Sequence, residues 1–282
     1  PMTLFRILFY FLLTIVGIYS PSAQEITLEA FKTDTLDKVF LNKCIYRVYY
    51  QTEIKQDTSQ NLPNRGLTLL QIGSKMSKFI DFYQHYTDSL RDETARKKNH
   101  SLATSEVTNF QYSLYSKIIF RNQVFRNYPQ KDINTVRLGT EFGEYFTYEE
   151  IAPRFDWEIS LNEEKNIKGY RCKKATCSYR GRIYQAWYSE DIPIPMGPYV
   201  FGGLPGLIME IRDSNNEYVF VAMAVLLIKN YDPIYRVNTP YEFLYERDKS
   251  WHEIKKSYQN LYFEIDGKIL RSVTPYNPIE KD

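Results

Sequence analysis

The chain has 282 residues and a formal net charge of +2, with 36 Lys and Arg against 34 Asp and Glu. This near balance excludes an electrostatic basis for nucleic-acid binding, and the length fits one large domain. With 25 Tyr and 17 Phe but only 12 Gly, the composition favours β-strands.

The N-terminus has the pattern of a secretory signal. A short basic segment ends at Arg6, an apolar run extends from Ile7 to Ile18, and small residues follow up to Ala23. We expect residues 1–23 to be removed. The alternative is a retained anchor, but the apolar run is shorter than the ~20 residues that a spanning helix needs. The pattern therefore predicts an exported protein, periplasmic or associated with the outer membrane, with no transmembrane span after signal removal.

The first half of the mature chain predicts strands and one helix. Residues 39–54 alternate between apolar and polar side chains, as a long strand does. Residues 67–73 and 78–82 predict a hairpin, and the polar stretch 83–98 predicts a helix. Shorter strands are expected at 117–126, 133–138, 144–148 and 157–161.

Two further hairpins are expected in the second half, formed by 169–179 with 182–188 and by 207–212 with 218–228. Thr239-Pro240 can open a helix that runs to about Asn260. This order predicts a mainly β (α+β) fold, with a large curved antiparallel sheet or half-barrel and a few packed helices. Residues 24–273 would form a single domain, with a loosely held tail at 274–282.

The most distinctive segment runs from Gly197 to Ile211. Its glycines permit unusual backbone conformations and its prolines fix φ, while its large apolar residues favour burial. We therefore expect a tightly turned segment packed into the domain. The residues assigned to this structural motif are Gly197, Pro198, Gly202, Gly203, Pro205 and Gly206.

A dense aromatic and apolar group adjoins this segment. Its members could line a concave apolar site, or they could simply pack in the core, which is the commoner role of such residues. The candidate ligand-binding residues are Tyr184, Trp187, Tyr188, Tyr199, Phe201 and Leu204.

The segment Gly203-Leu-Pro-Gly-Leu-Ile208 resembles the signature of the GLPGLI family. Residues 167–175 and 181–188 also resemble that family. The resemblance implies an exported protein of Bacteroidetes-type bacteria and carries no established activity. The same strands are more loosely similar to lipoprotein carriers of the LolA/LolB type, whose half-barrel holds acyl chains.

The three cysteines leave at least one thiol unpaired in a monomer. Cys172 and Cys177 lie on one predicted strand, about 16 Å apart, which is beyond disulfide reach. A bridge from Cys44 to one of them remains open, as does the alternative of three buried thiols.

Known catalytic patterns are missing from the sequence. The three histidines do not have metal-site spacing, and the chain lacks a nucleophile elbow and a phosphate-binding loop. The adjacent acids Glu149 and Glu150 would point in different directions on a strand, so we do not expect them to pair. We assign no catalytic residue, metal or cofactor.

These patterns predict an exported envelope protein that is a non-enzymatic binding or assembly factor. Its expected partner is an apolar ligand or an envelope polypeptide. The alternative is an envelope glycan- or peptide-processing enzyme with an unrecognised site. A buried but solvent-accessible cluster of polar side chains would favour the enzyme, and a wide apolar concavity lined by residues 197–211 would favour the binding factor.

Overall fold

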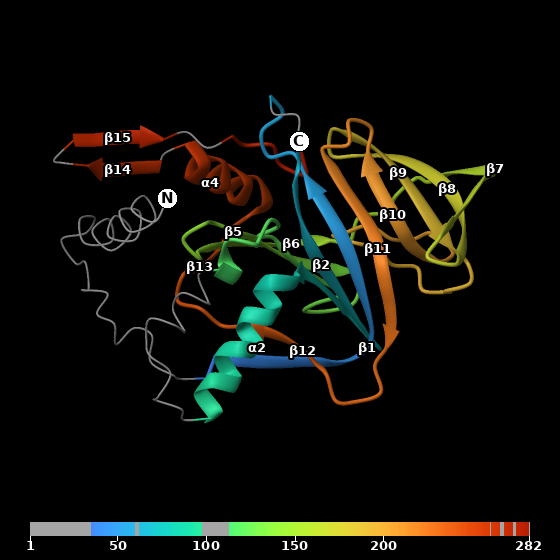
Figure 1. Cartoon of the computed structure of the whole chain (residues 1–282), viewed down its shortest axis with the longest axis horizontal. Coiled ribbons are helices and arrows are strands. Elements are labelled where there is room, and N and C mark those ends of the chain that lie inside the picture. Colours follow the sequence, from blue (N-terminus) through green and yellow to red (C-terminus); the bar gives the residue numbers. More distant parts are fainter. Residues whose placement is uncertain are drawn as a thin grey trace, which may run out of the picture.

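The computed structural model describes residues 35–59, 62–97, 113–259, 261–265, 268–272 and 275–281, and it is mainly β (Figure 1). The strands are β1 (Lys38–Ile54), β2 (Asn64–Gly73), β3 (Ser77–Asp81), β4 (Gln123–Arg126), β5 (Ile133–Gly139), β6 (Tyr145–Ile151), β7 (Glu158–Ile167), β8 (Tyr170–Tyr179), β9 (Arg182–Ser189), β10 (Leu207–Asp213), β11 (Tyr218–Leu227), β12 (Pro233–Val237), β13 (Glu242–Leu244), β14 (Leu261–Ile265) and β15 (Lys268–Ser272). The longer helices are α2 (Phe82–Lys97) and α4 (Arg247–Gln259). The predicted fold class is confirmed.

The large sheet consists of two meanders that meet at the long strand β1. Strands β1 to β6 follow one another on one side, and β11 back to β7 follow one another on the other. The junction is the antiparallel pair β1–β11, while β12 pairs with the beginning of β1. Every pair in the sheet is antiparallel except β13 with β6. Strands β14 and β15 form a separate hairpin, which lies apart from the sheet in Figure 1.

The connection from β6 to β7 forces the sheet to curve. These strands are ten positions apart in the strand order. In a flat sheet they would be about 48 Å apart. Residues 152–157 join them, and such a linker reaches at most roughly 25 Å. The two outer regions of the sheet must therefore approach each other, and Phe155 in the linker contacts Tyr179 of β8 with ring centroids 5.0 Å apart.

The segment between β9 and β10 fills the interior of the curved sheet. Tyr199 and Phe201 are at most 1% exposed. The Phe201 ring lies 4.5 Å from that of Tyr184 on β9, and its carbonyl accepts a 2.7 Å hydrogen bond from Arg126 on β4. This one segment therefore contacts both meanders, and the expectation that it packs into the domain is met.

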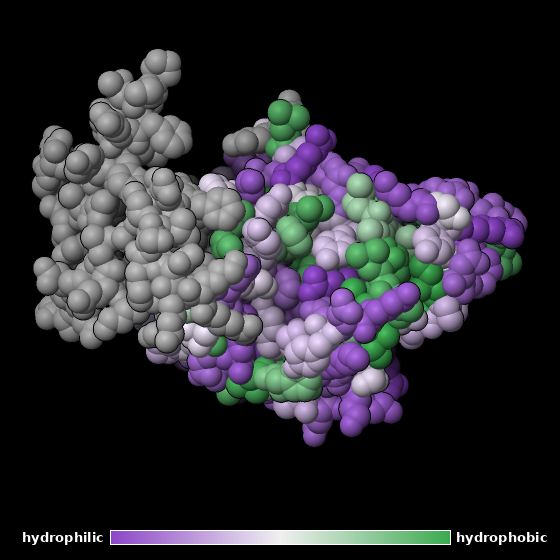
Figure 2. Space-filling view, turned by 60° about the horizontal axis from the view of Figure 1, so that its bottom comes forward, coloured by the Kyte–Doolittle hydropathy of each residue, from purple (hydrophilic) through white to green (hydrophobic). Residues whose placement is uncertain are grey.

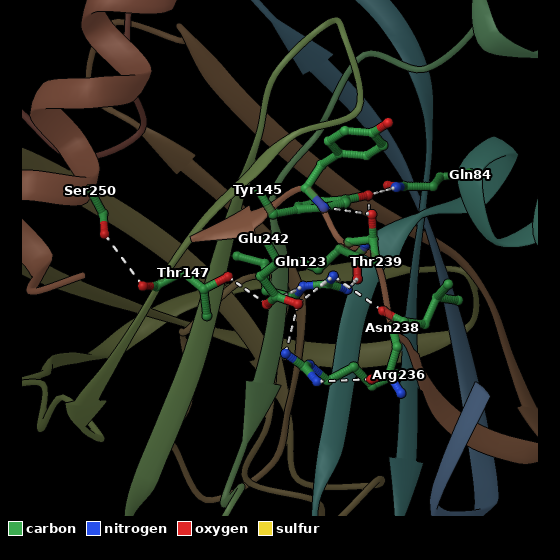
Figure 3. Close-up of polar contacts among 12 residues, drawn as sticks. Gln84, Gln123, Tyr145, Thr147, Arg236, Asn238, Thr239, Glu242 and Ser250 are labelled. Carbon is green, nitrogen blue, oxygen red and sulfur yellow. Dashed lines mark hydrogen bonds and ion pairs between the residues drawn. The ribbon is translucent and has the colours of Figure 1, made fainter. Parts of the chain in front are cut away.

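The C-terminal part differs from the expected single helix. Residues 242–244 form β13, and the helix begins only at Arg247. The reason is a buried cluster of charged and polar groups around Glu242. Its carboxylate accepts hydrogen bonds from the Arg236 guanidinium and the Thr147 hydroxyl (Figure 3). It also accepts a hydrogen bond from the guanidinium of Arg137. These contacts hold the segment extended against β6, and they outweigh its local helix signals.

The three thiols are free and buried. Burial raises the pKa of Cys172 to about 11 and the pKa of Cys44 and Cys177 to about 12. Of the two alternatives from the sequence, the structure therefore has three buried thiols.

Two glycines of the buried segment are required for different reasons. A Cβ on Gly206 would lie 2.0 Å from the backbone oxygen of Ser189, a separation that the neighbouring strand cannot accommodate. Gly203 has a φ of +86°, but no other atom lies within 4 Å of the place its Cβ would take. The first position is restricted by space and the second by conformation.

We predict that Gly206→Ala lowers the free energy of unfolding by about 3 kcal/mol or more, because backbone must move. Gly203→Ala should cost only about 1 kcal/mol, the strain of a left-handed alanine. Denaturant unfolding of both variants measures the difference. Equal losses would show that the contact with Ser189 is relieved at little cost.

Candidate functional site

The predicted ligand-binding residues belong to the core. Five of them, Tyr184, Tyr188, Tyr199, Phe201 and Leu204, are at most 1% exposed. The sixth, Trp187, is partly exposed, and the Lys165 ammonium lies 4.4 Å from its ring centroid. The rings pack against one another and against the sheet, so they give the interior its shape. Their role in binding a ligand stays a prediction.

A different group of side chains combines burial with charge, and it lies where the outer regions of the sheet approach each other. Its centre is a pair of carboxylates, Glu150 on β6 and Glu280 near the C-terminus, which we call the carboxylate pair. Arg180, in the turn between β8 and β9, lies 3.3 Å from a Glu150 oxygen and 3.9 Å from a Glu280 oxygen. One guanidinium therefore contacts both acids.

The turn that holds Arg180 follows from its sequence. Arg180 and Gly181 both have positive φ, at 45° and 70°, which is the geometry of a two-residue hairpin turn. The hairpin predicted across these two residues is confirmed. Because the turn is tight, the side chain of Arg180 is presented at the tip of the hairpin, toward β6.

Glu280 is held by hydrogen bonds that satisfy both of its oxygens. Its side chain is fully buried. The Tyr199 hydroxyl donates to one oxygen at 2.6 Å, and Arg247, the first residue of α4, donates to the other at 2.5 Å. A buried carboxylate with a charged donor and a phenol donor is strongly fixed in position.

Glu150 is less well satisfied. Its side chain is 11% exposed, and its Oε1 atom is buried without a hydrogen-bond partner. Burial, and then repulsion from Glu280, raise the pKa of Glu150 from 4.5 to about 7, against the attraction of Arg180 and Arg247. Glu150 can therefore hold or release a proton near neutral pH, as a general acid must.

Aromatic groups close the carboxylate pair from the interior. Tyr148 on β6 accepts a 3.3 Å hydrogen bond from the Trp251 indole of α4, and the Tyr179 hydroxyl lies 3.5 Å from Glu280. Burial raises the pKa of both phenols, and the carboxylates add to the effect. The phenols therefore remain neutral donors, so the proton that can exchange near neutral pH belongs to Glu150.

Sequence reasoning did not find this site. The sequence predicts that Glu149 and Glu150 point in different directions on a strand, and the structure agrees, with Glu149 exposed and Glu150 half-buried, but the sequence does not indicate that Glu150 meets Glu280. Sequence reasoning also expected a loose tail, whereas Asn277, Ile279 and Glu280 are buried. The signal available in the sequence is the apolar Ile279, which directly follows Pro278. A tail that is fully exposed to solvent has no need of a large apolar residue, so Ile279 indicates burial.

A second buried polar cluster lies between α2 and the sheet. The Lys78 ammonium donates to the Tyr235 carbonyl at 2.9 Å, and burial lowers its pKa to about 7. The neighbouring Gln71 is fully buried, and both polar atoms of its side chain are without partners. In the same cluster the Tyr235 hydroxyl lies 3.3 Å from Nδ1 of the buried His85 and 3.5 Å from Oδ2 of Asp88, so an acid and a base share this phenol.

In the view of Figure 2, apolar residues on the surface are interspersed with hydrophilic residues. The exposed apolar side chains of the molecule include Phe40, Leu227 and Tyr231. Within the described ranges, no helix has the length and apolarity to cross a membrane. The described residues also contain no grouping of His, Cys, Asp and Glu suited to a metal ion.

Part of the chain is similar to a known domain family. Residues 150–245, roughly a third of its length, match the family described as "N-glycanase peptide, N-terminal domain". Two solved structures of PNGF-II, in space groups C2 and P21, are similar at 16% identity, with TM-scores of 0.48 and 0.46. The likeness covers 76% of this chain but 33% and 34% of those chains, so this chain spans about a third of their length. No curated protein matches it.

The family expected from the sequence is therefore wrong. The region that contains Gly203–Ile208 matches the N-glycanase domain, not the GLPGLI family. The LolA/LolB resemblance and the Bacteroidetes assignment have no support either. The physical reason is that glycines and prolines among large apolar residues meet a need for tight turns and close packing, and unrelated families can share this need.

The raised pKa of Glu150 predicts a specific pH dependence. Because the folded protein holds this proton more tightly than the unfolded chain, the contribution to stability is complete below pH 4.5 and lost as pH rises through 7. Glu150→Gln imitates the protonated form. We expect it to match wild type at pH 4.5 and to exceed it at pH 8 by roughly 2 kcal/mol.

Denaturant unfolding between pH 4.5 and 8 measures this difference. Glu149→Gln is the matched control, since Glu149 is the adjacent residue and is exposed. Parallel pH profiles for wild type and Glu150→Gln would contradict the assignment.

Proposed function

We propose that this chain is an exported glycan-processing protein that acts on N-linked glycoproteins, with the carboxylate pair as its acid–base centre. The observation that carries the proposal is the match of residues 150–245 to the N-glycanase N-terminal domain. Glu150, Tyr179, Arg180 and Tyr199 all lie within that region. The match favours the alternative from the sequence over a non-enzymatic binding factor.

Hydrolytic release of a glycan requires a proton for the leaving group. Glu150 is suited to supply it, because its pKa of about 7 leaves it partly protonated at neutral pH. Its Oε1 atom is buried without a hydrogen-bond partner, so a substrate group that reached it would not have to displace an existing bond. Arg180 would then stabilise the carboxylate that remains after the proton has been donated.

Access to this centre requires movement. The Glu280 side chain is fully buried and that of Glu150 nearly so. The elements that cover the pair are the beginning of α4 and residues 275–281. Glu280 must stay in place to keep the pKa of Glu150 high, so the element that would have to shift to admit a glycan is the beginning of α4.

The test is release of a fluorescent glycan from an N-glycopeptide by the purified protein. We expect turnover that declines above pH 7 as Glu150 loses its proton, and a loss of about 100-fold or more in Glu150→Gln. Glu149→Gln should retain wild-type activity. A folded wild-type protein that releases no glycan, or equal rates in wild type and Glu150→Gln, would contradict the proposal.

A further inference from the structure

Residues 275–281, which we call the C-terminal strap, lie in a groove built from side chains of the second meander. The groove donates to three consecutive strap carbonyls. Tyr218 donates to Asn277 O at 2.5 Å, Arg182 to Pro278 O at 2.6 Å and Tyr184 to Ile279 O at 2.9 Å. The bonds go to the backbone, so this part of the groove recognises an extended polypeptide rather than a particular side chain.

Side chains of the strap add specificity at both ends. At one end, the Asn277 amide accepts from Arg182 at 2.7 Å and donates to the Lys55 carbonyl at 2.7 Å. At the other, Glu280 is bound by Tyr199 and Arg247. Between them Ile279 is 1% exposed. Along the strap, the groove therefore binds an amide side chain, then an apolar side chain and then a carboxylate.

The main donor of the groove, Arg182, is held by side chains of the sheet itself. Arg182 is fixed by ion pairs to Asp213 at 2.8 Å and Glu217 at 2.6 Å, and all three residues lie on or beside paired strands. The strap, by contrast, belongs to no sheet, and the hairpin β14–β15 before it pairs only with itself. Its attachment to the domain therefore resembles that of a bound peptide.

We propose that this groove is a polypeptide-binding site, and that the strap is an intramolecular occupant which a partner polypeptide can replace. The replacing segment would be extended and would carry an amide side chain, then an apolar residue two positions later, then a carboxylate. An empty groove would leave the buried donors of Arg182, Tyr184 and Tyr218 without partners, which favours exchange of one segment for another over simple release. The inference shares Glu280, Tyr199 and Arg247 with the proposed acid–base centre, but peptide binding is measured without glycan release, so failure of one proposal is distinguishable from failure of the other.

The test uses the full chain with a protease site introduced at residues 273–274. The protein folds before it is cut, so the strap starts in place. A labelled peptide with the sequence of residues 275–282 is then added, and binding is followed by fluorescence anisotropy. We expect the cut protein to bind the peptide at least 10-fold more tightly than the uncut protein, in which the tethered strap competes.

Peptide variants test the chemistry of recognition. A peptide with Glu280→Gln should bind the cut protein at least 10-fold more weakly, because it loses the charged bond to Arg247. A peptide with Pro275→Ala is the control and should change binding by less than threefold, since the Pro275 ring is exposed and cannot form a hydrogen bond.

Three results would overturn the proposal. Failure of the cut protein to bind the labelled peptide would make the strap a permanent part of the core. Equal binding of the Glu280→Gln peptide would show non-specific adhesion. A dimer of uncut copies with exchanged straps, seen by native mass spectrometry, would make a second copy of this chain the occupant.

Discussion

The short connection between β6 and β7 is the constraint on which the rest of the structure depends. It joins strands that would be about 48 Å apart in a flat sheet. The sheet must curve, and a curved sheet has an interior that must be filled. The segment between β9 and β10 fills it, which explains why this segment combines large apolar residues with glycines that admit close backbone contact. The requirement for Gly206 is thus tied to a linker about fifty residues earlier in the sequence.

The same closure creates the charged centre. When the outer regions of the sheet approach each other, Glu150 on β6 comes to face the turn after β8, and Arg180 at that turn provides the opposite charge. A single ion pair of this kind gains little if it is partly exposed. Here Glu280 enters the same space, so two acids share two arginines, and burial makes the protonated form of Glu150 competitive near neutral pH. The unusual acid is therefore a product of topology, not of local sequence.

This division explains what could be predicted. Strand β1 and the hairpin across Arg180-Gly181 follow from alternation and turn residues, and both are local signals. The burial of the Gly197–Ile211 segment also follows from composition. Strand β13 could not be predicted from local signals, because it depends on the contact of Glu242 with Arg137, and these residues are far apart in sequence. The carboxylate pair was missed for the same reason: Glu150 and Glu280 are separated by most of the second half of the chain, and neither has a local pattern that marks it.

Glu280 belongs both to the strap and to the carboxylate pair, so the groove and the acid are linked. Repulsion from Glu280 and burial together keep the pKa of Glu150 high. If the strap left and the groove stayed empty, both causes would weaken while Arg180 remained, and the pKa of Glu150 would fall toward its ordinary value. Glu150 would then be ionised at neutral pH and unable to donate a proton. A polypeptide that brought its own carboxylate to the same place would restore the repulsion and the burial. Occupancy of the groove by a matching segment would thus decide whether Glu150 is protonated at neutral pH, without any change in the sheet that holds it.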